Sequence, residues 1–254
     1  MRKSIFGFMN IVILLSCFEA MGANGEGYEK AMNDARSIAQ ECEQHGKRDY
    51  ISYVNCDFID NQFFKRNYEY PHRSYWQNME NPEWIIKFTD CSNRVTISKK
   101  IHKLIKTYRI NNIIVPEKQP IQFLSSGVSS KPFLVVENYI DNLIKDESIG
   151  LELYKKISLE EAANIAFVIL NADVGDLAYQ NLPIYIDKKG SIKVAFIDCG
   201  CLASSSDFST TPNVEYDSFL EKLNPQVAMR LLDFDEIGNV DQLKDPGFLI
   251  RSGL

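Results

Sequence analysis

Three oxygen-bearing side chains lie within one short stretch, residues 174–201, whose residue types and spacing suit phosphoryl chemistry. Asn181 follows Asp176 by five residues, and Asp198 comes after two short apolar segments separated by a turn with Gly190. Two of these side chains could hold Mg²⁺ through oxygen atoms, which that cation prefers as ligands. The remaining carboxylate could orient an attacking hydroxyl group and accept its proton.

The segments between these residues predict a β-hairpin. Residues 183–186 and 192–197 are apolar runs, and the turn Asp187-Lys188-Lys189-Gly190 joins them. A glycine-containing turn between two apolar runs is typical of two antiparallel strands. Such a hairpin would return the chain to its starting point and place Asp198 beside Asp176.

The same stretch resembles the catalytic and metal-binding loops of the protein-kinase-like superfamily. Residues 174–181 read Val-Gly-Asp-Leu-Ala-Tyr-Gln-Asn beside the kinase pattern H-R-D-L-x-x-x-N, and Asp198-Cys199-Gly200 stands where kinases have D-F-G. The glycine before Asp176 is more similar to the H-G-D motif of the aminoglycoside- and choline-kinase branch. The resemblance implies that Asp176 is catalytic and that Asn181 and Asp198 hold Mg²⁺.

Two upstream segments resemble the parts of a kinase that contact the nucleotide. Residues 83–88 predict a strand, and Lys87 is similar to the lysine of the V-A-I-K strand, which contacts the phosphates of ATP. Residues 133–139 predict a strand that leads into a polar turn, similar to the kinase hinge that binds adenine. The resemblance implies that Lys87 and Glu137 contact ATP. The alternatives are a solvated lysine and a plain buried strand.

The resemblance also implies the fold class, which is α+β. We expect a two-lobed protein-kinase-like fold with a small mixed sheet in the N-terminal lobe and a shortened, mostly helical C-terminal lobe. The predicted boundaries are a signal peptide at residues 1–22, an N-terminal lobe at 23–137 and a C-terminal lobe at 138–254.

Local patterns predict the helices that surround these motifs. One helix is predicted to begin at Ser158, because Ser158 and Glu161 have the spacing of a capping box. The aromatic and amide side chains of residues 59–82 predict a core patch beneath an irregular loop, with a recognition surface as the alternative. The other predicted helices cover residues 28–45, 92–108, 214–223 and 226–232.

The N-terminal residues predict export. Arg2 and Lys3 precede an apolar run at residues 5–18, and small residues follow it, which is the pattern of a secretory signal peptide. The run is shorter than the roughly 20 apolar residues of a transmembrane helix, so we expect no transmembrane segment in the mature chain. Alternatively, the sequence Leu14-Leu15-Ser16-Cys17 resembles a lipoprotein processing box, with Cys17 as the lipidated residue.

Composition argues against nucleic acid as the main partner and against a zinc site. The 254-residue chain is 45% hydrophobic and carries a net charge of −6, which argues against nucleic acid as the main partner. Without Cys17 the number of cysteines is odd, so an exported chain would keep at least one thiol outside an internal disulfide. The chain has no Cys-x-x-Cys pair and three histidines, and it predicts no zinc site.

The expected function is that of an exported kinase-like phosphotransferase. It would use ATP and Mg²⁺ to phosphorylate a hydroxyl group on a small molecule or on a protein. Three departures from the family pattern favour an alternative, a catalytically inactive pseudokinase that serves as a protein-interaction module. The chain has no glycine between Asp49 and Thr89, no glutamate between Cys91 and Asn112, and Val174 in place of the usual histidine. A third possibility is an exported structural protein in which the motif is coincidental.

Overall fold

The computed structural model describes residues 25–44, 64–66, 75–89, 93–121, 133–198 and 212–236. The predicted signal peptide, Cys17 and the Cys199-Gly200 part of the D-x-G motif lie outside these residues. The chain divides into two compact units, residues 1–90 with 119–139 and residues 91–118 with 140–254. Each unit has its own hydrophobic core.

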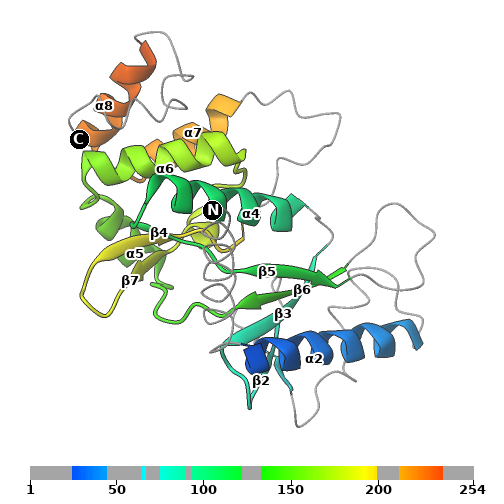
Figure 1. The fold of residues 1–254 in the computed structure, drawn as a ribbon. Coiled ribbons are helices and arrows are strands. Elements are labelled where there is room, and N and C mark those ends of the chain that lie inside the picture. The colour runs from blue at the N-terminus through cyan, green and yellow to red at the C-terminus, as the bar shows by residue number, and fades with distance from the viewer. Residues whose placement is uncertain are drawn as a thin grey trace, which may run out of the picture. The chain divides into compact units, whose positions relative to one another are not determined.

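The described residues form six α-helices and two small sheets, so the fold is α+β as predicted (Figure 1). The kinase-like arrangement of two lobes stays a prediction, as do the lobe boundaries 23–137 and 138–254. The compact units differ from those boundaries, because residues 91–118 group with the later part of the chain and residues 138–139 with the earlier part. None of the helices in the described segments is long and apolar enough to cross a membrane.

The first unit contains a five-stranded sheet. β2 pairs antiparallel with both β1 and β3, and β3 pairs antiparallel with β6. The predicted strands at residues 83–88 and 133–139 are confirmed as β3 and β6. In spatial order the strands are β1 (Phe64–Arg66), β2 (Tyr75–Asn78), β3 (Trp84–Thr89), β6 (Phe133–Asn138) and β5 (Lys118–Ile121).

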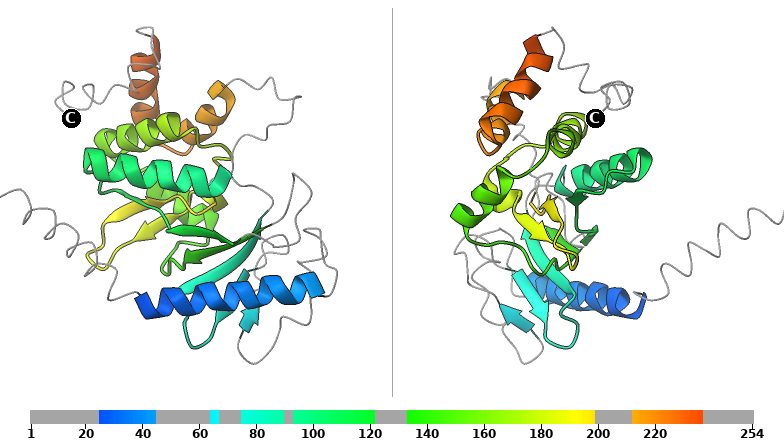
Figure 2. Two further views of the ribbon diagram at one scale, coloured as in Figure 1. Left: turned by 45° about the vertical axis from the view of Figure 1, so that its right-hand side comes forward. Right: turned by 90° about the vertical axis from the view of Figure 1, so that its left-hand side faces the viewer.

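Helix α2 (Gly25–Gln44) covers one face of this sheet and packs against β3 and β6 (Figures 1 and 2). Its buried residues Ala31, Ala35 and Ile38 follow helical spacing, so they form one apolar stripe. The stripe packs in one core cluster with Trp76, which is fully buried, and with the alternate residues of β3 and β6 that face the helix. The burial of Trp76 agrees with the core interpretation of the aromatic stretch, most of which lies outside the described residues.

The second unit packs helices on a three-stranded sheet. The sheet has the order β4 (Ile113–Ile114), β8 (Ile192–Ala195), β7 (Ile184–Ile186), with β4 parallel and β7 antiparallel to β8. Figure 2 shows α4 and α6 side by side over this sheet. The helices are α4 (Asn93–Tyr108), α5 (Glu147–Tyr154), α6 (Leu159–Ala172), α7 (Pro212–Leu220) and α8 (Pro225–Glu236).

Two local predictions in this unit are confirmed at atomic detail. Ser158 Oγ accepts from the amide of Glu161 at 3.2 Å, and the Glu161 carboxylate accepts from the amide of Ser158 at 2.9 Å, which completes the capping box of α6. β7 and β8 form the predicted hairpin. In its turn the Asp187 carboxylate accepts from two backbone amides, and Gly190 has a φ of 80°, a value that glycine adopts without strain.

Candidate functional site

The loop that follows α6 presents Asp176 at the surface. Helix α6 ends at Asp173 in the left-handed conformation, with a φ of 56°, and Asp176 adopts a φ of 54°. Between and after these turns, Val174 and Leu177 are buried in the core of the unit. The two apolar anchors hold the loop in place, and the exposed residue Asp176 lies between them in the chain.

Asn181 connects the two ends of the predicted catalytic stretch. Its side-chain Nδ2 donates to the backbone carbonyl of Asp176 at 2.9 Å. The backbone carbonyl of Asn181 accepts from the amide of Ile197 at 3.0 Å. Asn181 is completely buried, so neither bond competes with bulk water. The structure therefore brings Asp176, Asn181 and Asp198 to one end of the hairpin, because Asp198 directly follows Ile197.

Two buried tyrosine side chains hold this loop through hydrogen bonds to backbone carbonyls. Tyr179 lies in the short 3₁₀ turn η2 (Tyr179–Asn181) and donates to the carbonyl of Ile144 at 2.7 Å. Tyr154 of α5 donates to the carbonyl of Leu182 at 2.6 Å, and its complete burial raises the pKa of its phenol well above 10.0. These tyrosines were not among the predicted site residues. Gly150, inside α5, was the available signal, because it lies against the Tyr179 ring.

Asp198 is buried and forms an ion pair with Arg94. The Arg94 Nη1 atom, from the first turn of α4, donates to Asp198 Oδ1. Lys118, which is 5% exposed, donates to the carbonyl of Ile197 at 2.6 Å. Arg94 and Lys118, from separate segments, thus contact two adjacent residues, Asp198 and Ile197. Sequence reasoning missed both, although an arginine at the start of a predicted helix is unfavourable for the helix dipole and was a usable signal.

Lys87 and Glu137 form a second cluster, in the first unit. In the register of β3 and β6, Lys87 lies opposite Val135 and Ile85 lies opposite Glu137, so these four side chains share the sheet face that points away from α2. Lys87 and Glu137 are diagonal neighbours on that face, and their side chains form an ion pair. The Glu137 side chain is 3% exposed and the Lys87 side chain 21% exposed.

The predicted site residues therefore fall into two groups, one in each compact unit. The side chains of Lys87 and Glu137 meet in the first unit, while hydrogen bonds to backbone carbonyls link the segments of Asp176, Asn181 and Asp198 in the second. The absence of a glutamate from residues 92–111 left Lys87 without a predicted ionic partner. The structure supplies Glu137 in that role, from an adjacent strand rather than from a helix.

The donor set near Asp198 can be compared with what Mg²⁺ requires. The described residues contain no group of three or more His, Cys, Asp or Glu side chains placed to hold a metal. Mg²⁺ sites are commonly built from one or two protein oxygens completed by water and phosphate. Asp198 and Asn181 offer oxygen atoms of the kinds that such a site uses, and the Asp198 carboxylate is paired with the guanidinium of Arg94.

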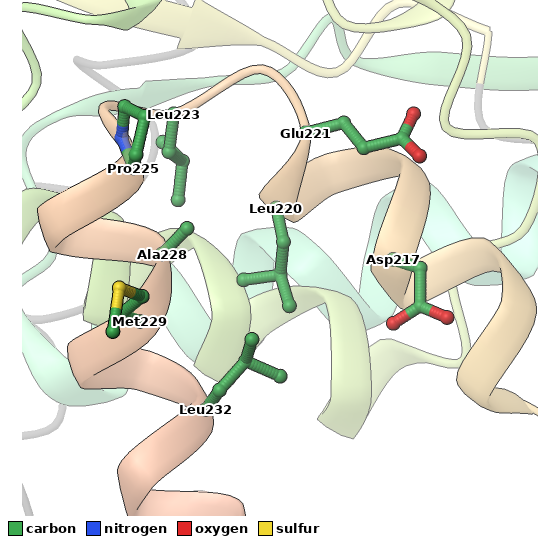
Figure 3. A pocket seen from close by; sticks show the side chains of 8 residues that line it. All are labelled: Asp217, Leu220, Glu221, Leu223, Pro225, Ala228, Met229 and Leu232. Carbon is green, nitrogen blue, oxygen red and sulfur yellow. The ribbon is translucent and has the colours of Figure 1, made fainter.

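A shallow groove of about 370 Å³ lies between α7 and α8 in the second unit (Figure 3). Leu220, Leu223 and Leu232 contribute apolar walls, and the carboxylates of Asp217 and Glu221 come from the α7 side. No predicted site residue lines this groove.

No protein-family model matches the chain, and no curated protein matches its sequence. The likeness to kinases therefore depends on the residues described above.

Proposed function

We propose that the chain is a kinase-like phosphotransferase that moves the γ-phosphate of ATP to a hydroxyl acceptor. The observation that supports this proposal most directly is the double role of Asn181. Its side chain donates to the backbone carbonyl of Asp176, and its backbone carbonyl accepts from the amide of Ile197, the residue before Asp198. One buried residue thereby links the backbone at Asp176 to the backbone beside Asp198, the two carboxylates that such a reaction would use.

Asp176 takes the part of the general base. The residue is exposed, and its backbone is held by the bond from Asn181. In this position the carboxylate orients the hydroxyl group toward the phosphate and accepts its proton as the new bond forms. Positioning supplies much of the rate in this class of reaction.

Asn181 and Asp198 are the proposed metal ligands. When bound, Mg²⁺ supplies positive charge that offsets the charge of the transferring phosphate. Lys87 stays the proposed phosphate contact, and Glu137 holds its ammonium group in the first unit through the ion pair. ATP and Mg²⁺ are the proposed ligands, and the acceptor is a small molecule or a protein met after export.

A second candidate function, that of a non-catalytic kinase-like interaction module, is favoured by a specific contact. Arg94 already neutralises Asp198, the carboxylate that should hold the metal. The sequence also lacks the glycines that let a backbone loop approach phosphates, since none occurs between Asp49 and Thr89.

Thermal unfolding of the full chain with and without Mg-ATP, combined with an assay for ADP release in the presence of small-molecule and protein hydroxyl acceptors, separates these functions. A ligand at 100 times its dissociation constant stabilises by about 2.7 kcal/mol, which is a shift of several degrees for a chain of this size. We expect the shift in the wild type and in Asp217→Asn, an exposed control, but not in Asp198→Asn. A shift without ADP release supports the interaction module, and no shift in the wild type contradicts a nucleotide site.

A further inference from the structure

The ion pair between Arg94 and Asp198 gives the candidate metal ligand a counter-ion from within the chain. The Asp198 side chain is 8% exposed and that of Arg94 is 29% exposed, and both belong to the second unit. A carboxylate buried to this extent stays ionised only beside positive charge or strong donors. The guanidinium group supplies such charge, and with it the carboxylate is neutralised before any metal ion arrives.

The position of Arg94 on α4 makes this contact exchangeable. Arg94 lies in the first turn of the helix, and that turn contains no acidic side chain. The positive end of the helix dipole repels a cation there. The attraction of Asp198 therefore keeps Arg94 in place although the helix dipole repels its charge. A cation that neutralised Asp198 would remove the attraction between Asp198 and Arg94.

A divalent ion cannot simply add to the pair. Lys118 is buried and donates to the carbonyl of Ile197, one residue before Asp198. An ion bound to the Asp198 carboxylate would therefore enter a region that already contains a guanidinium and an ammonium group. In a partly buried region, repulsion between like charges is much stronger than in water. The guanidinium group contacts the carboxylate itself.

We infer that Arg94 is the resident cation of Asp198 and determines the metal requirement of the site, because a divalent ion binds Asp198 only by displacing the Arg94 guanidinium. The choice of Asp198 as a metal ligand rests on the proposed function, whereas the competition between Arg94 and the ion is a separate claim. With Arg94 in place the site has low affinity for metal, and Arg94 is a specificity residue rather than a catalytic one.

Binding of Mn²⁺ alone to the full chain tests the inference, with unbound Mn²⁺ measured by electron paramagnetic resonance. Arg94→Gln removes the positive charge beside Asp198 and should raise the affinity for Mn²⁺ at least about tenfold. The added affinity should disappear in the double variant Arg94→Gln/Asp198→Asn. Equal affinities in Arg94→Gln and the wild type, or a gain that persists in the double variant, would overturn the inference.

Lys100 provides the matched control. It lies on the same helix as Arg94 and forms an ion pair with Asp173, whose side chain is 76% exposed. Lys100→Gln removes the same charge from α4 without touching Asp198, so its Mn²⁺ affinity should equal that of the wild type. A similar gain in Lys100→Gln would mean that general charge, rather than displacement of Arg94, controls metal binding.

A second measurement avoids dependence on the folding of Arg94→Gln. In the wild type, the side-chain Nε–H resonance of Arg94 can be identified by its loss in Arg94→Lys. We expect this resonance to move as MgCl₂ is added, with the same midpoint as Mg²⁺ binding measured by calorimetry. Saturation with Mg²⁺ without any change in the Arg94 resonance, or no Mg²⁺ binding at any concentration, would refute displacement.

The two claims fail in different ways. If Arg94→Gln gains Mn²⁺ affinity through Asp198 while Mg-ATP neither stabilises the chain nor yields ADP, the competition stands and the phosphotransferase proposal falls. If Mg-ATP binds and reacts while Arg94→Gln and the wild type bind Mn²⁺ equally, the phosphotransferase stands and the role of Arg94 is wrong.

Discussion

The side chains of Lys87 and Glu137 form an ion pair across the neighbouring strands β3 and β6. The pair lies on the sheet face opposite α2, and the carboxylate is almost completely buried. In the kinase resemblance the corresponding lysine pairs with a glutamate from a helix. Here the pairing comes from strand register, so the orientation of Lys87 is set by the sheet rather than by movement of a helix.

A double-mutant cycle should detect strong coupling between Lys87 and Glu137. Lys87→Met removes the ammonium partner of a buried carboxylate and should cost about 3 kcal/mol of unfolding free energy. Glu137→Gln in the same chain should recover most of that loss, because the charge that lacked its partner is also removed. Urea unfolding of the wild type, the two single variants and the double variant measures the coupling.

The exposed pair Lys30–Glu80 in the same unit is the control for that cycle. Its side chains are 42% and 66% exposed, so water screens the interaction and no coupling should be measurable. Additive effects at Lys87 and Glu137, within about 0.5 kcal/mol, would show that the buried pair does not act as a unit.

The conformation of Asp176 predicts how its variants should differ. Its φ of 54° is tolerated by aspartate and asparagine but costs alanine about 1 kcal/mol. Asp176→Asn should therefore unfold like the wild type, whereas Asp176→Ala should be less stable by about that amount. If Asp176 is the general base, both variants should lose phosphoryl transfer by about 100-fold or more. Full transfer activity in Asp176→Asn would remove Asp176 from the mechanism.

Features coded by neighbouring residues were predictable from the sequence. The β7–β8 hairpin follows from two apolar runs and a turn, and the capping box of α6 follows from Ser158 and Glu161. The meeting of Asp176, Asn181 and Asp198 follows from the hairpin, because a hairpin of this length returns the chain to its start.

Contacts between distant segments were not predictable in the same way. Arg94 and Asp198 are separated by 104 positions, and no local pattern relates them. The pairing of Lys87 with Glu137 depends on β3 and β6 being neighbours, although β4 and β5 come between them in the chain. Sequence reasoning identified Lys87 and Glu137 separately, but only the strand register puts them on one face and within contact.

Gly150 leaves space for the ring of Tyr179, so Gly150→Ala should disturb the loop that carries Asn181. An added Cβ atom would lie 1.9 Å from the Tyr179 hydroxyl oxygen and 2.1 Å from the ring carbon that bears it. The ring is buried and its hydroxyl group is bonded to Ile144, so it cannot simply turn away. We expect a loss of about 1–3 kcal/mol in urea unfolding, despite the better helix propensity of alanine.

The double variant Gly150→Ala/Tyr179→Leu makes this prediction specific. A smaller side chain at position 179 should relieve the clash, so the two substitutions together should cost less than the sum of their separate effects. Gly25→Ala is the control, because an added Cβ there meets nothing within 4 Å. Unfolding of Gly150→Ala at the same urea concentration as the wild type would contradict the close packing of α5 against Tyr179.

Lys222 should make the chain more stable as the pH rises in the alkaline range. The residue is 8% exposed, and burial lowers the pKa of its ammonium group below 10.5, with Glu221 and Glu147 partly opposing that shift. Between the lowered pKa and 10.5 the unfolded chain binds more protons at this site than the folded chain does. The contribution of Lys222 to the unfolding free energy therefore increases with pH across that window and is least favourable below it.

Lys222→Met should remove this pH-dependent contribution. The ammonium group donates to the carbonyl of Ser218 at 2.6 Å and to its hydroxyl group at 3.2 Å, and the lowered pKa indicates that these bonds only partly offset the cost of burying its charge. We expect the variant to have a higher Tm than the wild type at pH 7, with the difference narrowing as the pH approaches 10.5. Lys103→Met, at an exposed position on α4, should match the wild type at every pH. A lower Tm for Lys222→Met at pH 7 would mean that the Ser218 bonds outweigh the cost of burying the charge.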